Sequence, residues 1–240
     1  ARMAAAAARA GRNPDDVRLV AVTKTHPASV IPEVTAAGVL DVGENRVQEA
    51  LAKQVELRES AGLRSPGQGR HPGMPEPGDL RWHLIGHLQT NKARHAVGHF
   101  DLIHSLDSER LAQALNAQCQ KQARLRCDVL LQVNVSGEET KGGFEPEELP
   151  GALERILTGC PALHIEGFMT MAPFELEPEQ TRPHFRRLAE LAAAMRKRFG
   201  GHERFSGCEL SMGMTNDFEI AIEEGATIVR IGSALFGARG

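Results

Sequence analysis

The residue best suited to take part in a reaction is Lys24, which follows a short apolar run. The run 19–23 (Leu-Val-Ala-Val-Thr) is small and β-branched, which is typical of a buried parallel strand, and 25–27 (Thr-His-Pro) predicts a turn. At such a strand end the lysine stem lies in apolar surroundings, and loss of hydration disfavours the ammonium form. The amine is then nucleophilic enough to form a Schiff base with a carbonyl compound. From this stretch alone, a solvated lysine after a strand is the more common reading.

Two glycine-containing stretches late in the chain have the composition of phosphate-binding loops. Residues 211–216 (Ser-Met-Gly-Met-Thr-Asn) offer a hydroxyl group, a glycine for close backbone approach and a following helix start. Residues 231–234 (Ile-Gly-Ser-Ala) repeat this arrangement one unit later. Gly-Ser turns are usually structural, but loops after the last two strands are the usual phosphate site of a barrel. A phosphate site together with a Schiff-base lysine suggests pyridoxal 5′-phosphate (PLP).

Arg230 and the histidines complete the residues of chemical interest. Arg230 stands in an apolar run, 229–232 (Val-Arg-Ile-Gly), so it is expected either to face a ligand or to form a structural ion pair at the barrel rim. The pairs His83/His87 and His95/His99 have metal-ligand spacing, but the first straddles a glycine and the second lacks the glutamate of a zinc-protease helix. We therefore predict no metal site.

Strand-like and helix-like stretches alternate along the chain. Further strands are expected at 39–42, 80–85, 101–105, 125–134, 163–169, 208–211 and 227–231, and helices at 28–37, 46–58, 87–97, 108–120, 147–157, 180–199 and 216–224. The segment 60–79 is rich in proline and glycine and is expected to be a surface loop inside the domain.

Eight strand–helix units predict an α/β protein with a closed (β/α)8 barrel, also called a TIM barrel. An extra helix is expected at 1–10, and residues 1–240 are expected to form a single domain. A doubly wound open sheet is the alternative, since periodicity does not show whether the sheet closes. No Gly-x-Gly-x-x-Gly follows the first strand, which counts against a dinucleotide site.

The composition is that of a globular protein in a reducing compartment. The 240 residues are 41% hydrophobic with a net charge of -3, which gives no reason to expect nucleic acid or a membrane surface as partner. No apolar run approaches the roughly 20 residues that span a bilayer. The four cysteines form no C-x-x-C pair, which favours free thiols and a cytoplasmic location.

Five stretches together resemble the pyridoxal phosphate homeostasis proteins, once labelled proline synthase co-transcribed homologues. They are 21–24 (Ala-Val-Thr-Lys), 43–49 (Gly-Glu-Asn-Arg-Val-Gln-Glu), 82–92 (Trp-His-Leu-Ile-Gly-His-Leu-Gln-Thr-Asn-Lys), 210–214 (Leu-Ser-Met-Gly-Met) and 229–233 (Val-Arg-Ile-Gly-Ser). Their order and spacing cover nearly the whole chain. The segment 60–79 is longer than expected of the family, but it falls between the motifs.

The resemblance implies a single barrel like the N-terminal domain of alanine racemase, of the fold-type III PLP-binding class. It implies that PLP is held as an internal aldimine on Lys24 and that Arg230 faces the pyridine nitrogen. The other implied contacts line the ring (Asn45, His83, Met169) or hold the phosphate (Ser211, Met212, Gly213, Gly232, Ser233). The implied role is PLP homeostasis, in which a monomer binds the cofactor and delivers it to PLP-dependent apo-enzymes.

An arginine at the ring nitrogen favours a carrier over a catalyst. Adjacent cations repel, so Arg230 keeps the ring nitrogen unprotonated and the ring is a weaker electron sink. A racemase tolerates this but needs a second acid–base group opposite the lysine. In relatives that racemise alanine this group is a tyrosine of a second domain, and the 240 residues contain no tyrosine. We expect a PLP carrier without robust turnover. The alternatives are a PLP-dependent amino-acid racemase or lyase using Lys24 and His83 as bases, and a phosphate-binding barrel that needs no aldehyde cofactor.

Overall fold

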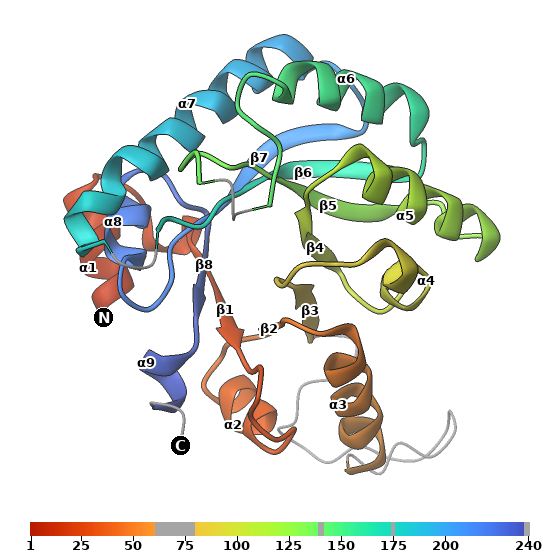
Figure 1. Ribbon diagram of the computed structural model, residues 1–240. Coiled ribbons are helices and arrows are strands. Elements are labelled where there is room, and N and C mark those ends of the chain that lie inside the picture. The colour runs from red at the N-terminus through yellow and green to blue at the C-terminus, as the bar shows by residue number, and fades with distance from the viewer. Residues whose placement is uncertain (61–79, 139–141, 174–175, 238–240) are drawn as a thin grey trace.

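The computed structural model describes residues 1–60, 80–138, 142–173 and 176–237, and its strands close into a parallel barrel. The strands are β1 (Arg18–Val22), β2 (Asp41–Glu44), β3 (Arg81–Leu84), β4 (Leu102–Leu106), β5 (Cys127–Gln132), β6 (Leu163–Met169), β7 (Phe205–Ser211) and β8 (Ile228–Ile231). Each pairs with the next, and β8 pairs with β1, with Arg230 opposite Val20. The sheet therefore has no free edge. Figure 1 shows this ring of strands with the helices outside it. The predicted closed barrel is confirmed, and the open sheet is wrong.

The helices lie outside the ring, where α2 to α8 connect successive strands, α1 precedes β1 and α9 follows β8. They are α1 (Arg2–Arg9), α2 (Val30–Ala36), α3 (Val47–Ser60), α4 (Ala93–Ala96), α5 (Glu109–Lys121), α6 (Leu149–Gly159), α7 (Arg182–Phe199), α8 (Phe218–Glu223) and α9 (Ser233–Phe236). Short 3-10 turns are η1 (Pro14–Asp16), η2 (Thr90–Lys92) and η3 (Pro178–Thr181). The predicted loop 60–79 lies outside the described residues, apart from Ser60 at the end of α3. None of the described helices combines the length and apolar character that a bilayer crossing requires.

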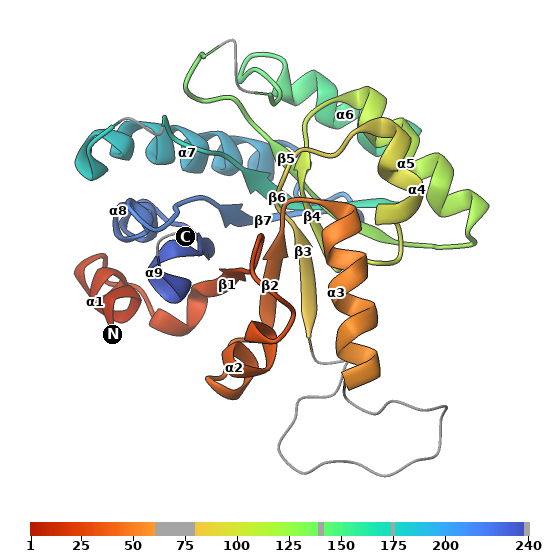
Figure 2. The same ribbon diagram turned by 60° about the horizontal axis from the view of Figure 1, so that its bottom comes forward.

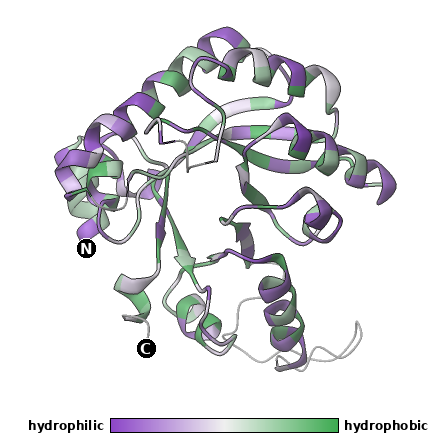
Figure 3. Cartoon of the chain, in the orientation of Figure 1, coloured by the Kyte–Doolittle hydropathy of each residue, from purple (hydrophilic) through white to green (hydrophobic). Residues whose placement is uncertain are grey.

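Apolar side chains of the described residues form a core inside the ring, a large outer core between strands and helices, and a smaller cluster where α2 and α3 meet β2 and β3. The inner core joins buried side chains of five different strands, Val20, Leu102, Leu130, Met169 and Ile228. The outer core is larger, and Phe185 of α7 is fully buried in it. Figure 3 shows hydrophobic residues along much of the strands, and a mixture of hydrophobic and hydrophilic residues on the helices. Burial on both faces explains why several strands are continuous apolar runs in the sequence.

The predicted N-terminal helix is confirmed, and ion pairs join it to α8. Its guanidinium groups reach carboxylates of α8, with Arg2 bonded to Glu219 at 3.0 Å and Arg9 to Glu223 at 2.7 Å. Arg12 donates to the main-chain carbonyl groups at the end of α8 and just beyond it. Figure 2 shows α1 and α8 on the same side of the barrel. The helix thus packs against α8 on the outside of the barrel.

The largest departure from the predicted elements follows β3. A helix was expected from about residue 87 to 97, whereas the chain runs as a loop to Gln89 and forms only η2 and the four-residue α4. Gly86 explains the loop, because a Cβ atom there would lie 2.4 Å from the carbonyl oxygen of Asn45. Ser105 also donates a hydrogen bond to the carbonyl of Gly86. The chain is held against its neighbours at this point, and the helix begins only after it.

The wall of the barrel is irregular between β6 and β7. Their register shifts between Ile165 and Gly167, where the single residue Glu166 of β6 lies opposite the three residues 206–208 of β7. At Gly167 the strands approach so closely that a Cβ atom would lie 1.9 Å from the carbonyl oxygen of Glu209. Backbone lies on both sides of this contact, so only glycine fits.

We therefore expect Gly167→Ala to lower the free energy of unfolding by about 3 kcal/mol, because β6 or β7 must shift to admit the methyl group. Gly159→Ala is the matched control, because nothing lies within 4 Å of a Cβ atom there. The control should be as stable as the wild type, since alanine is also the better helix former. Urea unfolding followed by circular dichroism measures both, and equal stabilities for the two variants would contradict the close approach.

Candidate functional site

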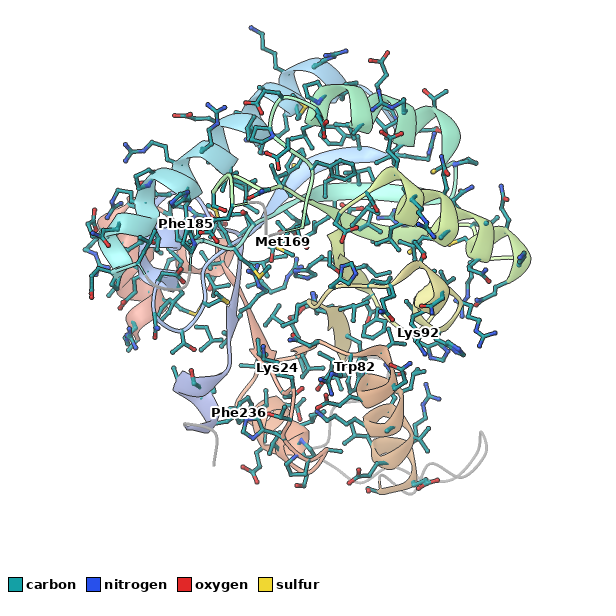
Figure 4. All side chains as sticks on the ribbon, viewed as in Figure 1. Lys24, Trp82, Lys92, Met169, Phe185 and Phe236 are labelled. Atoms are coloured by element: carbon teal, nitrogen blue, oxygen red, sulfur yellow. The ribbon has the colours of Figure 1, made fainter. Side chains whose placement is uncertain are left out.

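All of the predicted site residues lie at one mouth of the barrel. Lys24 and Asn45 follow β1 and β2, Met169 and Ser211 end β6 and β7, and His83 and Arg230 stand next to last in β3 and β8. Met212, Gly213, Gly232 and Ser233 come directly after β7 and β8. The carboxyl ends of parallel strands meet at one end of a barrel, which is where active sites of this fold occur. Figure 4 shows Lys24 and Met169 within the ring of strands.

A buried ionic group holds the strand end that carries Lys24. Lys53 of α3 is 5% exposed, and its Nζ atom donates to the carbonyl oxygen of Thr23 at 2.8 Å and to Oε1 of Glu44 at 2.6 Å. The hydroxyl group of Thr23 donates to the same Glu44 oxygen at 2.6 Å. The residue before Lys24 is therefore held by both its main chain and its side chain.

The residue after Lys24 is held by the same group. Its amide, that of Thr25, donates to Oε1 of Glu49 at 2.5 Å, and Lys53 donates to this oxygen at 3.0 Å. Thr25 has a φ of 67°, a left-handed conformation that residues other than glycine seldom adopt. The hydrogen bonds on both sides stabilise this turn, so the direction in which Lys24 leaves β1 is set by α3.

Burial disfavours the charged form of both carboxyl groups in this ionic group. Burial raises the pKa of Glu44 above its usual value, against the hydrogen bonds from Lys53 and Thr23. Burial works in the same direction on Glu49, but the Thr25 amide and Lys53 outweigh it and lower the pKa of that carboxyl. Among the described residues, Oε2 of Glu44 has no hydrogen-bond partner. A buried carboxylate with one oxygen unpaired depends strongly on the lysine beside it.

Arg230 lies buried inside the barrel mouth. One terminal nitrogen donates to the hydroxyl group of Ser211 at 2.5 Å and the other to the carbonyl oxygen of Thr170 at 3.0 Å. Burial lowers the pKa of Arg230 to about 10, with Asp217 acting in the opposite direction. The guanidinium group therefore remains charged at neutral pH. Among the described residues Arg230 has no partner in an ion pair at the barrel rim, which was one of its two predicted roles.

The two predicted phosphate loops lie side by side and carry unused backbone donors. The hydroxyl group of Ser233 donates to that of Thr215 at 3.2 Å, which joins the loops after β8 and β7. The N–H groups of Gly213 and Gly232 have no acceptor among the described residues. Gly213 has a φ of 90°, and a Cβ atom there would lie 2.5 Å from the Cβ atom of Ala221. Paired amides from neighbouring glycine loops fit an anion such as a phosphate group.

Several predicted contacts involve side chains that already have partners inside the protein. The hydroxyl group of Ser211 lies between Arg230 and Nδ1 of His104. The ring of His83 lies between His104 and Asp41, and Met212 is fully buried in the outer core. The phosphate contacts predicted for Ser211 and Met212, and the ring contact predicted for His83, stay predictions.

Other residues that shape the mouth were not identified from the sequence. Glu49 and Lys53 have the i,i+4 spacing of a helical ion pair, which was a usable signal. Glu44 and Glu49 were noted in the sequence only as members of the family stretch 43–49, with no role assigned. Asp41 and His104 gave no local signal, because their partners lie on other strands.

One group of metal-ligand type occurs among the described residues, at the opposite end of β5 and β6. It consists of Asp128, His164 and Glu166. Arg126 already donates to both carboxylates, at 2.6 and 2.7 Å. This group is separate from the mouth that holds Lys24.

Comparison with known proteins places the chain first in a class and then in a family. The family model described as "Alanine racemase, N-terminal domain" matches residues 1–240, so the fold is that of this domain. The pyridoxal phosphate homeostasis protein of Aquifex aeolicus is 43% identical over 99% of this chain and 94% of its own length. That of Pseudomonas aeruginosa is 43% identical over the whole chain and 92% of its own length. PipY of Synechococcus elongatus, solved with PLP bound, has a TM-score of 0.78 and 37% identity over 99% of this chain and all of its own. The chain belongs to the family of pyridoxal phosphate homeostasis proteins.

The ionic group behind Lys24 makes Lys53 a sensitive position. We expect Lys53→Met to lower the free energy of unfolding by about 3–5 kcal/mol near neutral pH, because Glu44 would stay buried without its counter-ion. Lys121→Met at the exposed end of α5 is the control and should change stability by less than about 0.5 kcal/mol.

The loss in Lys53→Met should depend on pH. Without the lysine, burial raises the pKa of Glu44 further above its unfolded value of 4.5, so the folded state favours the protonated carboxyl. Stability then falls as pH rises from the unfolded pKa to the folded pKa. Urea unfolding at about pH 5 and about pH 8 measures this, and a loss that is larger at the lower pH would contradict the assignment.

Proposed function

We propose that this protein binds PLP as a Schiff base on Lys24 and acts in PLP homeostasis inside the cell, without robust catalytic turnover. The observation that carries the proposal is the arrangement of one mouth. It places a strand-end lysine, a buried cationic arginine and two glycine loops with unused N–H groups at the ends of neighbouring strands. Relatives along the whole chain are named for PLP homeostasis, and one was solved with PLP.

The residues fit the parts of PLP separately. Gly213, Gly232 and Ser233 would hold the phosphate, and Lys24 would provide the amine for the aldehyde. Met169 and Asn45 would border the ring, and Arg230 would face its nitrogen. When bound, PLP supplies an aldehyde for covalent attachment and a ring that can accept electrons.

The charge on Arg230 supports a carrier over a catalyst. The guanidinium group is buried, its pKa is about 10, and its hydrogen bonds to Ser211 and Thr170 hold it in place. A fixed positive charge disfavours protonation of a neighbouring ring nitrogen, and an unprotonated ring withdraws electrons less strongly. The 240 residues contain no tyrosine that could serve as the acid–base group opposite the lysine.

The wider role follows from the same proposal. Residues 1–240 act as one cofactor-binding domain, in the cytoplasm and as a monomer. The partners are PLP itself and the PLP-dependent apo-enzymes to which it is delivered. The named relatives support this role through the words PLP homeostasis.

Visible absorbance tests the attachment directly. After incubation with PLP, we expect the wild type to gain an absorbance band that borohydride reduces, with the label recovered on the peptide containing Lys24. Lys24→Ala should not gain the band, because it lacks the amine. Lys92→Ala, which removes a lysine from η2, should behave like the wild type. A band of equal size in Lys24→Ala would contradict the assignment, and no band in the wild type would favour a phosphate-binding barrel without an aldehyde cofactor.

Turnover assays separate the carrier from the racemase or lyase alternative. We expect PLP-loaded protein to produce no D-amino acid or carbonyl product from a broad panel of L-amino acids above the rate of free PLP. Chiral chromatography and carbonyl trapping measure these products. Turnover that exceeds free PLP and disappears in Lys24→Ala would favour the enzyme.

A further inference from the structure

A chain of buried hydrogen bonds crosses the inside of the barrel from Arg230 to Asp41. Arg230 donates to Oγ of Ser211 at 2.5 Å, and this oxygen lies 2.8 Å from Nδ1 of His104. Nε2 of His104 lies 2.8 Å from Nδ1 of His83, and Nε2 of His83 lies 2.8 Å from Oδ1 of Asp41. All five residues are at most 4% exposed. They come from β8, β7, β4, β3 and β2, so the chain spans the interior from one wall to another.

The two ends of the chain determine its direction. Burial works to raise the pKa of Asp41, but hydrogen bonds from His83 and Arg81 outweigh it, so this pKa is lowered and the carboxylate only accepts. Nε2 of His83 must therefore carry the hydrogen. At the other end a guanidinium group only donates, so Ser211 accepts from Arg230 and its own hydrogen is directed to His104.

The middle of the chain agrees with this direction. Burial lowers the pKa of His104 well below its usual value, and the charges of Arg230 and Arg18 act in the same direction. His104 is therefore neutral, with one ring nitrogen that donates and one that accepts. Nδ1 accepts from Ser211, so Nε2 donates to His83. Each member then donates to the next, from Arg230 to Asp41.

The charge at the far end is well compensated. Asp41 is 3% exposed, forms an ion pair with Arg81 at the start of β3, and lies 3.9 Å from Nε of Arg18. Arg18 also pairs with Glu209 at 3.1 Å. These charges lie at the amino ends of β1, β2 and β3 and within β7, away from the mouth. They hold Asp41 ionised.

We propose that Asp41, His83 and His104 are positioning residues for Arg230, acting through the hydroxyl group of Ser211. The directed chain turns a lone pair of Ser211 towards Arg230 and so fixes one edge of the guanidinium group. This inference rests on the proposed function for its consequence, which is that Arg230 presents a constant face to the ring of bound PLP. It assigns His83 a role that its predicted ring contact did not include.

Nuclear magnetic resonance of the cofactor-free protein tests the direction of the chain. Imidazole 15N spectra should show the hydrogen of His104 on Nε2, with Nδ1 unprotonated. Asp41→Asn should add a second set of signals with the hydrogen on Nδ1, and it should shift the guanidinium signals of Arg230, because an amide can donate to His83 and reverse the chain. Asp101→Asn is the control, since Asp101 is also an aspartate near a strand start but accepts from the Trp82 amide outside this chain. It should leave these signals unchanged.

The rate at which the PLP-loaded protein releases PLP tests the consequence for cofactor binding. We expect Asp41→Asn and His104→Phe each to release PLP about tenfold faster than the wild type, the effect of losing one hydrogen bond to a charged group. The double variant should release it no faster than either, since both break one chain.

The outcomes separate the two claims. The positioning role would be overturned if the His104 hydrogen of the wild type lies on Nδ1. It would also be overturned if Asp41→Asn leaves the guanidinium signals of Arg230 unchanged. Both results count whether or not PLP binds. Additive effects on release would do the same. If the wild type takes up no PLP, the proposed function fails, while the spectra of the cofactor-free protein still decide the direction of the chain.

Discussion

The contact between Lys53 and Glu44 is the interaction on which the mouth of this barrel depends. It joins α3 to the ends of β1 and β2, and through Thr23 and Thr25 it holds the main chain on both sides of Lys24. A buried pair of this kind adds little net stability over an apolar alternative, but loss of one partner is costly. Here the pair matters because it fixes the position of the main chain around Lys24. A lysine on a free loop would sample many directions, whereas this one leaves the barrel wall from a turn anchored on either side.

A second system of polar contacts holds the residues on the opposite side of the mouth in place. Arg230 is held from inside the barrel by Ser211 and Thr170, and the loops after β7 and β8 are joined by Ser233 and Thr215. The two systems are separate, since one lies between the wall and α3 and the other lies inside the ring. In the proposed function, Lys24 would anchor PLP covalently on one side, and the two glycine loops with the positive charge of Arg230 would hold it on the other. Such a division would suit a protein that holds its cofactor without a substrate-side acid or base.

Much of the fold could be read from the sequence, because eight buried strands and their helices alternate with clear periodicity. Closure of the sheet was predicted from the number of strand–helix units, but their periodicity could not show it, since the pairing of Val20 with Arg230 joins the two ends of the chain. The expected start of β5 at residue 125 was early, because Leu125 is 90% exposed and the preceding Ala123 has a φ of 51°. The site residues were predictable as strand ends, yet His104 was not, because it contacts Ser211 across 107 residues of sequence. Local sequence patterns predict the position of a side chain along a strand, whereas its contacts across the barrel are seen only in the folded structure.

The most direct test of this account is a crystal structure of the wild-type protein after incubation with PLP. The account predicts continuous electron density from Nζ of Lys24 to the cofactor, the phosphate against the N–H groups of Gly213 and Gly232, and Arg230 within hydrogen-bond distance of the ring nitrogen. PLP bound at another place, or bound at the mouth with its phosphate away from the two glycine loops, would contradict it.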